Sequence, residues 1–135
     1  MEKVPIPIAT SRAEDAEQVR AHLAETPWEM VEIPLGHEFG AALKAASVPI
    51  LLLDSSLLET EDGPMWQHEL KKLAKARRSA CVILLSNVTD QYLWDEVVQN
   101  GGFDVLTRPF KKETILSVLL FAYAHCRTPW PKAVS

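Results

Sequence analysis

Short apolar runs alternate with longer segments of helical periodicity along most of the chain. Runs of Val, Ile and Leu that last only a few residues are typical of strands covered on both faces of a parallel sheet. Strict alternation of such strands with helices indicates an α/β domain. The pattern predicts strands over residues 4–9, 28–33, 48–53, 81–85 and 105–107, and helices over residues 13–25, 39–46, 64–77, 90–99 and 111–126.

This order of elements predicts a flavodoxin-like, doubly wound fold, in which five helices cover a five-stranded parallel sheet. A chain of 135 residues is long enough to bury one core, so we expect a single domain over residues 1–127. Residues 128–135 contain two prolines and show no periodicity. They are expected to form a tail or a linker stub.

Prolines and glycines qualify some of these elements. Pro5 and Pro7 make the first strand a poor one, because proline has no N–H to donate to a ladder. Pro64 suits the first turn of the third helix, where that N–H is not needed. The glycines after Asn100 suit the left-handed conformation that ends many helices, so the fourth helix is expected to stop there.

Three of the expected strands are followed by a polar residue of distinct chemistry. Asp54 follows the third strand, Ser86 the fourth and Arg108 the fifth. In open α/β folds, ligands bind in the crevice at the carboxyl ends of the strands. We therefore expect a carboxylate, a hydroxyl and a cation to meet at one edge of the sheet, where together they can hold a phosphoryl group.

The order and spacing of these residues resemble a receiver (response-regulator) domain of bacterial two-component signalling. The resemblance extends over residues 48–122 and includes Asp54, the Asp62-Gly63 pair, Ser86 and the segment NGGFDVLTRPF at residues 100–110. It implies a signal-transduction domain of a phosphorelay that is not itself an enzyme. Its partners would be a histidine kinase or a downstream effector.

The same resemblance implies roles for individual residues. Asp54 would be the phosphoacceptor, taking a phosphoryl group from a phosphohistidine and ligating Mg²⁺. Ser86 and Arg108 would contact that phosphoryl group, and the peptide bond before Pro109 is a candidate for the cis form. Arg108 replaces the lysine of the family; it keeps the charge but presents a planar fork rather than a point charge on a flexible stem.

A second departure concerns the metal. Receivers carry an acidic pair where the first strand ends, whereas this chain has Thr-Ser-Arg at residues 10–12. Mg²⁺ is usually held by one or two carboxylates plus phosphate and water. Asp54 with the Thr10 and Ser11 hydroxyls is therefore a poor ligand set for this ion, and the positive charge of Arg12 would repel it. Glu14 and Asp15 are the nearest acids, and we interpret them as first-turn residues stabilised by the helix dipole.

A third departure concerns output. The family usually places a mobile aromatic three residues before the cation, but here that residue is Val105, which is stiff at its first side-chain torsion. The last two helices carry many apolar residues, which indicates either a homodimer or partner interface or thicker packing within the domain. The predicted interaction surface consists of Tyr92, Trp94, Phe103, Val105, Leu120, Phe121 and Tyr123.

Bulk composition agrees with a globular domain: 47% of residues are hydrophobic, 24% are charged, and the net charge is −4. The largest basic block lies at residues 71–78, which is too little to predict direct nucleic-acid binding. No signal peptide or bilayer-spanning segment is visible, so we expect a cytoplasmic protein without membrane contact. The two cysteines are interpreted as reduced packing residues, and the four histidines show no metal-ligand spacing.

Three functional interpretations follow from the sequence. The favoured one is a pseudo-receiver, which keeps the fold for protein contacts and has lost or impaired Mg²⁺-dependent phosphorylation. The second is a working receiver phosphorylated on Asp54. The third, more remote, is an unrelated flavodoxin-like enzyme or small-ligand binder, although the chain has no phosphate-binding glycine loop and no nucleophile elbow.

Overall fold

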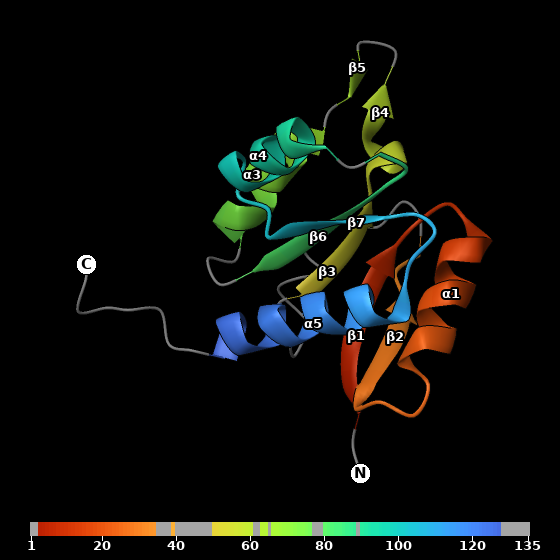
Figure 1. The fold of residues 1–135 in the computed structure, drawn as a ribbon. Coiled ribbons are helices and arrows are strands. Elements are labelled where there is room, and N and C mark those ends of the chain that lie inside the picture. Colours follow the sequence, from red (N-terminus) through yellow and green to blue (C-terminus); the bar gives the residue numbers. More distant parts are fainter. Residues whose placement is uncertain are drawn as a thin grey trace.

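The structure, a computed structural model, describes residues 3–34, 39, 50–60, 63–64, 66–76, 80–88 and 90–127. Its centre is a parallel five-stranded sheet with the strand order β2-β1-β3-β6-β7 (Figure 1). Every pair of neighbouring strands in this sheet is parallel. The strands are β1 (Val4–Ala9), β2 (Trp28–Glu32), β3 (Ile50–Asp54), β6 (Cys81–Ser86) and β7 (Asp104–Thr107).

Helices lie on both faces of this sheet, which confirms the predicted doubly wound, flavodoxin-like α/β fold. In Figure 1, α1 and α5 lie on one face, whereas α3 and α4 lie on the other. The expected helix over residues 39–46 falls outside the described residues except for Phe39, so four α-helices are described rather than five. They are α1 (Ala13–Leu23), α3 (Trp66–Ala76), α4 (Gln91–Gln99) and α5 (Lys112–Arg127).

The two layers of helices create two apolar cores, and β3 contributes to both. Ile50 and Leu52 belong to the core that includes residues of α1 and α5, whereas Leu51 and Leu53 belong to the core that includes residues of α3 and α4. Successive side chains of a strand point to opposite faces, so a strand covered on both sides needs an uninterrupted apolar run. The whole strand, including Asp54 at its end, is buried as a result.

The prolines in β1 are accommodated by the direction in which their backbone points. The Val4 N–H donates to the residue just before β2 (2.7 Å), and the Ile8 carbonyl accepts from the residue just after β2 (2.9 Å). Alternate residues therefore bond to β2, and Pro5 and Pro7 face β3 instead. The ladder between β1 and β3 begins only at Ile8↔Leu52. An internal strand thus tolerates two prolines because they lie on one edge, where pairing is short.

The segment after β3 differs from the sequence prediction. A 3₁₀ helix, η1 (Ser55–Leu58), leads into a small antiparallel hairpin of β4 (Glu59–Thr60) and β5 (Gly63–Pro64), which projects beyond α3 in Figure 1. The prediction that Pro64 begins a helix was therefore wrong. Proline's fixed φ and missing N–H suit an edge strand as well as a first helical turn, so the residue alone does not distinguish the two.

The predicted glycine stop after α4 is confirmed. Gly101 has φ +96°, a left-handed conformation that side chains other than glycine rarely adopt. A Cβ added to Gly102 would lie 2.5 Å from Val97 Cγ1, so only glycine fits that close approach. This tight turn directs the chain from α4 into β7.

The last helix is only partly covered by the rest of the domain. Ile115, Leu119 and Ala122 are fully buried, but Leu120 and Phe121 are 59% and 67% exposed. The helix is therefore amphipathic in packing although it is apolar over much of its surface. Among the described residues, no helix is long and apolar enough to cross a bilayer.

Candidate functional site

The three strand-end residues lie at the same edge of the sheet. Asp54, the last residue of β3, pairs with Leu85 in β6. Ser86, the last residue of β6, pairs with Thr107 in β7, and Arg108 follows directly. The parallel register therefore places Asp54, Ser86 and Arg108 on neighbouring strands, as the sequence predicted.

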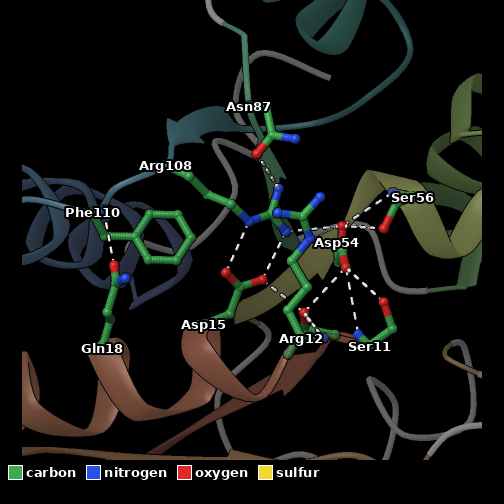
Figure 2. Close-up of polar contacts among 10 residues, drawn as sticks. Ser11, Arg12, Asp15, Gln18, Asp54, Ser56, Asn87, Arg108 and Phe110 are labelled. Carbon is green, nitrogen blue, oxygen red and sulfur yellow. Dashed lines mark hydrogen bonds and ion pairs between the residues drawn. The ribbon is translucent and has the colours of Figure 1, made fainter.

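Asp54 lies in a cage of hydrogen-bond donors (Figure 2). Its relative exposure is 0%. One carboxylate oxygen, Oδ1, accepts from the backbone N–H and the hydroxyl of Ser56, at 3.0 and 2.8 Å. The other, Oδ2, lies 3.1 Å from the Thr10 hydroxyl and 3.4 Å from both the amide nitrogen and the hydroxyl of Ser11. The carboxylate is thus satisfied from two directions by groups that follow β1 and β3.

The Arg108 guanidinium completes this cage and joins it to a second carboxylate. Nε and Nη2 donate to the two carboxylate oxygens of Asp15, at 2.8 and 2.7 Å. The same Nη2 lies 2.9 Å from Asp54 Oδ1. The Arg108 and Asp15 side chains are only 11% and 3% exposed, so this is a buried, bidentate ion pair. Figure 2 shows the guanidinium lying between the two acids.

Both Asp54 and Arg108 are stabilised in their charged forms. Burial by itself raises the pKa of Asp54, but the hydrogen bonds from Ser56 and the contact with Arg108 outweigh it and hold that pKa below its ordinary value of 3.8. The hydrogen bonds from Arg108 to Asp15 raise the pKa of the guanidinium, despite the opposing effect of burial. The site therefore holds a permanent cation against an ionised Asp54 at neutral pH.

Asp15 is the site residue that sequence reasoning missed. The sequence accounts for it as a first-turn acid, but the residue is buried and also accepts from the Thr10 hydroxyl at 2.7 Å. Its partner Arg108 is 93 positions away in the sequence. The one sequence signal that bears on it is the replacement of the family's lysine by arginine, because a planar fork is best satisfied by a second, bidentate carboxylate.

Ser86 and Pro109 lie beside this cluster. The Ser86 hydroxyl accepts from the Val88 amide (3.1 Å), and the Ser86 carbonyl accepts from the Arg108 amide (2.9 Å). The peptide bond between Arg108 and Pro109 is cis. The serine is therefore at the expected edge of the sheet, with its hydroxyl turned towards the loop that leads into α4.

The residues at this edge do not fit Mg²⁺ in their present arrangement. The oxygens of Asp15 and Asp54 converge on one point, and the Arg108 Nη2 occupies it, 2.7 and 2.9 Å from its two acceptors. Mg²⁺ needs oxygen ligands in near-octahedral order, and a guanidinium at that point both blocks and repels it. Within the described part of the chain, no group of three or more His, Cys, Asp or Glu side chains forms a metal cage.

The predicted interaction surface divides into exposed and packed residues. Tyr92 and Trp94 on α4 and Leu120 and Phe121 on α5 are exposed. Among the other three, Val105 differs from the prediction because it is buried, whereas Phe103 and Tyr123 are half-buried. Val105 is buried in the core that contains α3 and α4, Phe103 stacks at a tilt against His125, and Tyr123 meets Trp28 edge to face, with ring centroids 5.1 Å apart.

Comparison with known proteins adds a structural likeness. No protein-family model and no curated protein matches the sequence. Among solved structures, the signal receiver domain of an HD domain-containing protein from Pseudomonas fluorescens superposes with a TM-score of 0.73 at 16% identity, covering 95% of this chain and 92% of that one. A two-component response regulator from Clostridium difficile gives 0.69 at 15% identity, with 93% and 98% covered.

A third similar structure is the beryllofluoride-activated NtrC4 receiver domain dimer, with a TM-score of 0.72, 16% identity, and coverage of 90% of this chain and 98% of that one. All three are receiver domains or response regulators, and each match spans nearly the whole of both chains. At these identities the likeness concerns the backbone rather than the site residues. The chain therefore has the fold of response-regulator receiver domains.

Proposed function

We propose that this chain is a receiver-like signal-transduction domain that acts by protein contact, without Mg²⁺-dependent phosphotransfer at Asp54 and without enzymatic activity. The observation that carries the proposal is the position of one atom, Arg108 Nη2, which lies 2.7 Å from Asp15 and 2.9 Å from Asp54. The protein's own guanidinium takes the place where a metal ion would join these carboxylates. The site is then a structural ion cluster, in which one guanidinium bridges two carboxylates, rather than a reaction centre.

The surroundings of Asp54 support this interpretation. A carboxylate acts as a nucleophile on phosphorus only if a lone pair can approach in line with the leaving group. Asp54 has no exposed surface, and donors from Ser56, Ser11 and Arg108 surround both of its oxygens. Phosphotransfer therefore requires Arg108 to leave its buried pair with Asp15 first.

The alternative, a receiver phosphorylated on Asp54, has one observation in its favour. Asp54 is kept ionised by a lowered pKa and lies at a strand end beside a cation, which is the chemistry a phosphoacceptor needs. In that case the Asp15–Arg108 pair would open during the reaction, and Arg108 would turn to the phosphoryl oxygens.

Backbone amide NMR distinguishes the two interpretations. The protein is titrated with Mg²⁺ and then with beryllofluoride, which mimics a phosphorylated carboxylate, and Asp54→Asn is the matched control. We expect no saturable shifts at millimolar Mg²⁺ or on addition of beryllofluoride. Shifts that cluster around Asp54, Ser86 and Arg108 and vanish in Asp54→Asn would show that Asp54 is a working phosphoacceptor.

The surface that makes the contacts is proposed to be the exposed apolar part of α4 and α5. These helices lie on opposite faces of the sheet beside its edge strand, β7. The Trp94 indole N–H donates to Asp104 at the start of β7 (3.2 Å), which links the α4 side of this surface to the sheet edge. Exposed Leu120 and Phe121 extend it along α5, and such apolar patches usually mark interaction sites. Its partner is a kinase, an effector or a second copy of the chain, met in the cytoplasm.

Self-association is tested by sedimentation over a range of concentrations. We expect a mass that rises with concentration and falls back to the monomer in Phe121→Asp. Val88→Asp is the control, because Val88 is 59% exposed in the loop before α4, outside the proposed surface. A concentration-independent monomer mass in the unmodified protein would remove the homodimer and leave only a heterologous partner.

A further inference from the structure

The three residues 108–110 are bound to one face of α1. Asp15 holds the Arg108 side chain, Gln18 Oε1 accepts from the Phe110 amide (3.1 Å), and His22 Nε2 lies 2.9 Å from the Phe110 carbonyl. A carbonyl oxygen only accepts, so Nε2 must carry the hydrogen. Residues at positions i, i+3 and i+7 share one face of a helix, so these α1 side chains form a single row. We call Asp15, Gln18 and His22 the α1 clasp.

The clasp lies between the charged site and the start of α5. Arg108 belongs to the site, and Phe110, two residues later, has both of its backbone groups bound to α1. The Phe110 side chain is buried in the core that includes α1 and α5, and α5 begins at Lys112. One short segment, 108–110, therefore connects the guanidinium between two carboxylates to the first turn of the helix that carries Leu120 and Phe121.

Movement of this segment is restricted on its other side. The Arg108 amide donates to the Ser86 carbonyl (2.9 Å), and Thr107 pairs with Ser86 in the sheet. The sheet therefore holds the chain just before the guanidinium, whereas the Phe110 backbone is held by Gln18 and His22 of α1. Val105, which occupies the place of the family's mobile aromatic, is buried and β-branched and cannot swing outward.

We propose that Gln18 and His22 are positioning residues that couple the Arg108 site to α5, in place of the mobile aromatic that the family usually has where this chain has Val105. A change in how Asp15 holds Arg108 shifts the segment 108–110 and, through Phe110, the start of α5. The inference rests on the proposed function only in treating the exposed part of α5 as a contact surface. It deepens that function by identifying how the site can regulate it.

The test uses NMR shifts as the measure of coupling. Asp15→Asn keeps the size of the side chain but removes its charge, so it weakens the hydrogen-bonded ion pair with Arg108. We expect amide shifts at the site and also at Leu120 and Phe121. When the same change is made in a Gln18→Leu/His22→Leu background, shifts at the site should persist while those at Leu120 and Phe121 fall by about half or more, since the coupling path is broken.

Two control variants separate positioning from general stability. His22→Gln retains an N–H donor for the Phe110 carbonyl, so it should restore part of the coupling that His22→Leu removes. Arg20 lies on the same helix and pairs with the exposed Glu32 at 3.6 Å, away from residues 108–110, so Arg20→Gln should leave the shifts on α5 unchanged. Two results of Asp15→Asn would overturn the inference: equal shifts at Leu120 and Phe121 with and without Gln18 and His22, or no shifts there when both residues are present.

The outcome is also distinguishable from a failure of the proposed function. The Asp15→Asn perturbation needs neither Mg²⁺ nor beryllofluoride, so the coupling is measured even if Asp54 proves to be a phosphoacceptor. In the converse case, the site amides do not shift with Mg²⁺ or beryllofluoride, and Asp15→Asn also causes no shift on α5. The proposed function would then stand, and the coupling through Gln18 and His22 would be rejected. If the double variant does not fold, Gln18→Leu and His22→Leu are each tested alone, and each should lower the shifts at Leu120 and Phe121 because each removes one of the two contacts with Phe110.

Discussion

Replacing Asp15 with alanine removes the carboxylate that holds the Arg108 guanidinium through hydrogen bonds of 2.8 and 2.7 Å. The two side chains are 3% and 11% exposed, so water cannot take over these contacts. Removing one partner of a buried ion pair costs about 3–5 kcal/mol, because the remaining charge stays buried without compensation. Asp54 still contacts Arg108 at 2.9 Å, so we expect the lower end, a loss of about 3 kcal/mol in the free energy of unfolding.

The loss is measured by urea denaturation at pH 7 followed by circular dichroism. The midpoint should fall while the slope stays constant, which shows that stability rather than compactness has changed. Glu32→Ala is the matched control: its pair with Arg20 spans 3.6 Å with both side chains 60% exposed, so its removal should cost at most about 0.5 kcal/mol. A loss below about 1 kcal/mol for Asp15→Ala would refute the view that the pair is a buried structural element.

Further predictions concern the same site and the turn before β7. In Arg108→Ala, Asp15 and Asp54 face each other without a cation, so millimolar Mg²⁺ should raise the melting temperature of this variant but not that of the unmodified protein or of Arg108→Ala/Asp15→Asn. Despite its burial, Asp54 has a lowered pKa, so its ionised form stabilises the fold above pH 3.8. That stability is lost as the pH falls through the folded-state pKa, and acid titration of Asp54→Asn should lack this contribution. Gly102→Ala places a Cβ 2.5 Å from Val97 Cγ1 and should cost about 1–3 kcal/mol in urea denaturation, whereas an unchanged midpoint would contradict the close packing.

The strands were predictable because burial on both faces leaves a simple signal. An apolar run as short as the one before Asp54 fits a buried strand better than a helix, and the predicted end at residue 53 lies one residue before the end of β3. The prolines of β1 were also interpreted correctly as a weakness in the ladder. The edge on which that weakness lies depends on pairing with β2, and a single strand's sequence carries no information about its neighbours.

The site was predictable only in part, for a related reason. Asp54 and Arg108 are recognisable because they follow apolar runs, and the topology then brings them together. Asp15 has no such signal, because the helix dipole already accounts for an acid in the first turn of a helix. Its role becomes visible only when the chain folds back and places it against a residue 93 positions away. Val105 was assigned to the surface for a similar reason: the predicted surface surrounds it in sequence, but core side chains cover it in space.

Because the ladder between β1 and β3 is short, the contacts of Asp54 contribute to holding the sheet together. These strands join two parts of the sheet, the pair β1 and β2 and the trio β3, β6 and β7. Among the described residues, the pairs between them are Ile8↔Leu52 and Ala9↔Leu53. Immediately beyond this seam, the hydroxyls that follow β1 and the guanidinium that follows β7 all close on the same carboxylate. Asp54 therefore helps to hold the two parts of the sheet together where the backbone pairing between them is short. A covalent group on Asp54 would disturb these contacts and weaken the connection between the two parts of the sheet. In this chain, chemical modification of Asp54 therefore conflicts with the part that the same side chain plays in stabilising the sheet.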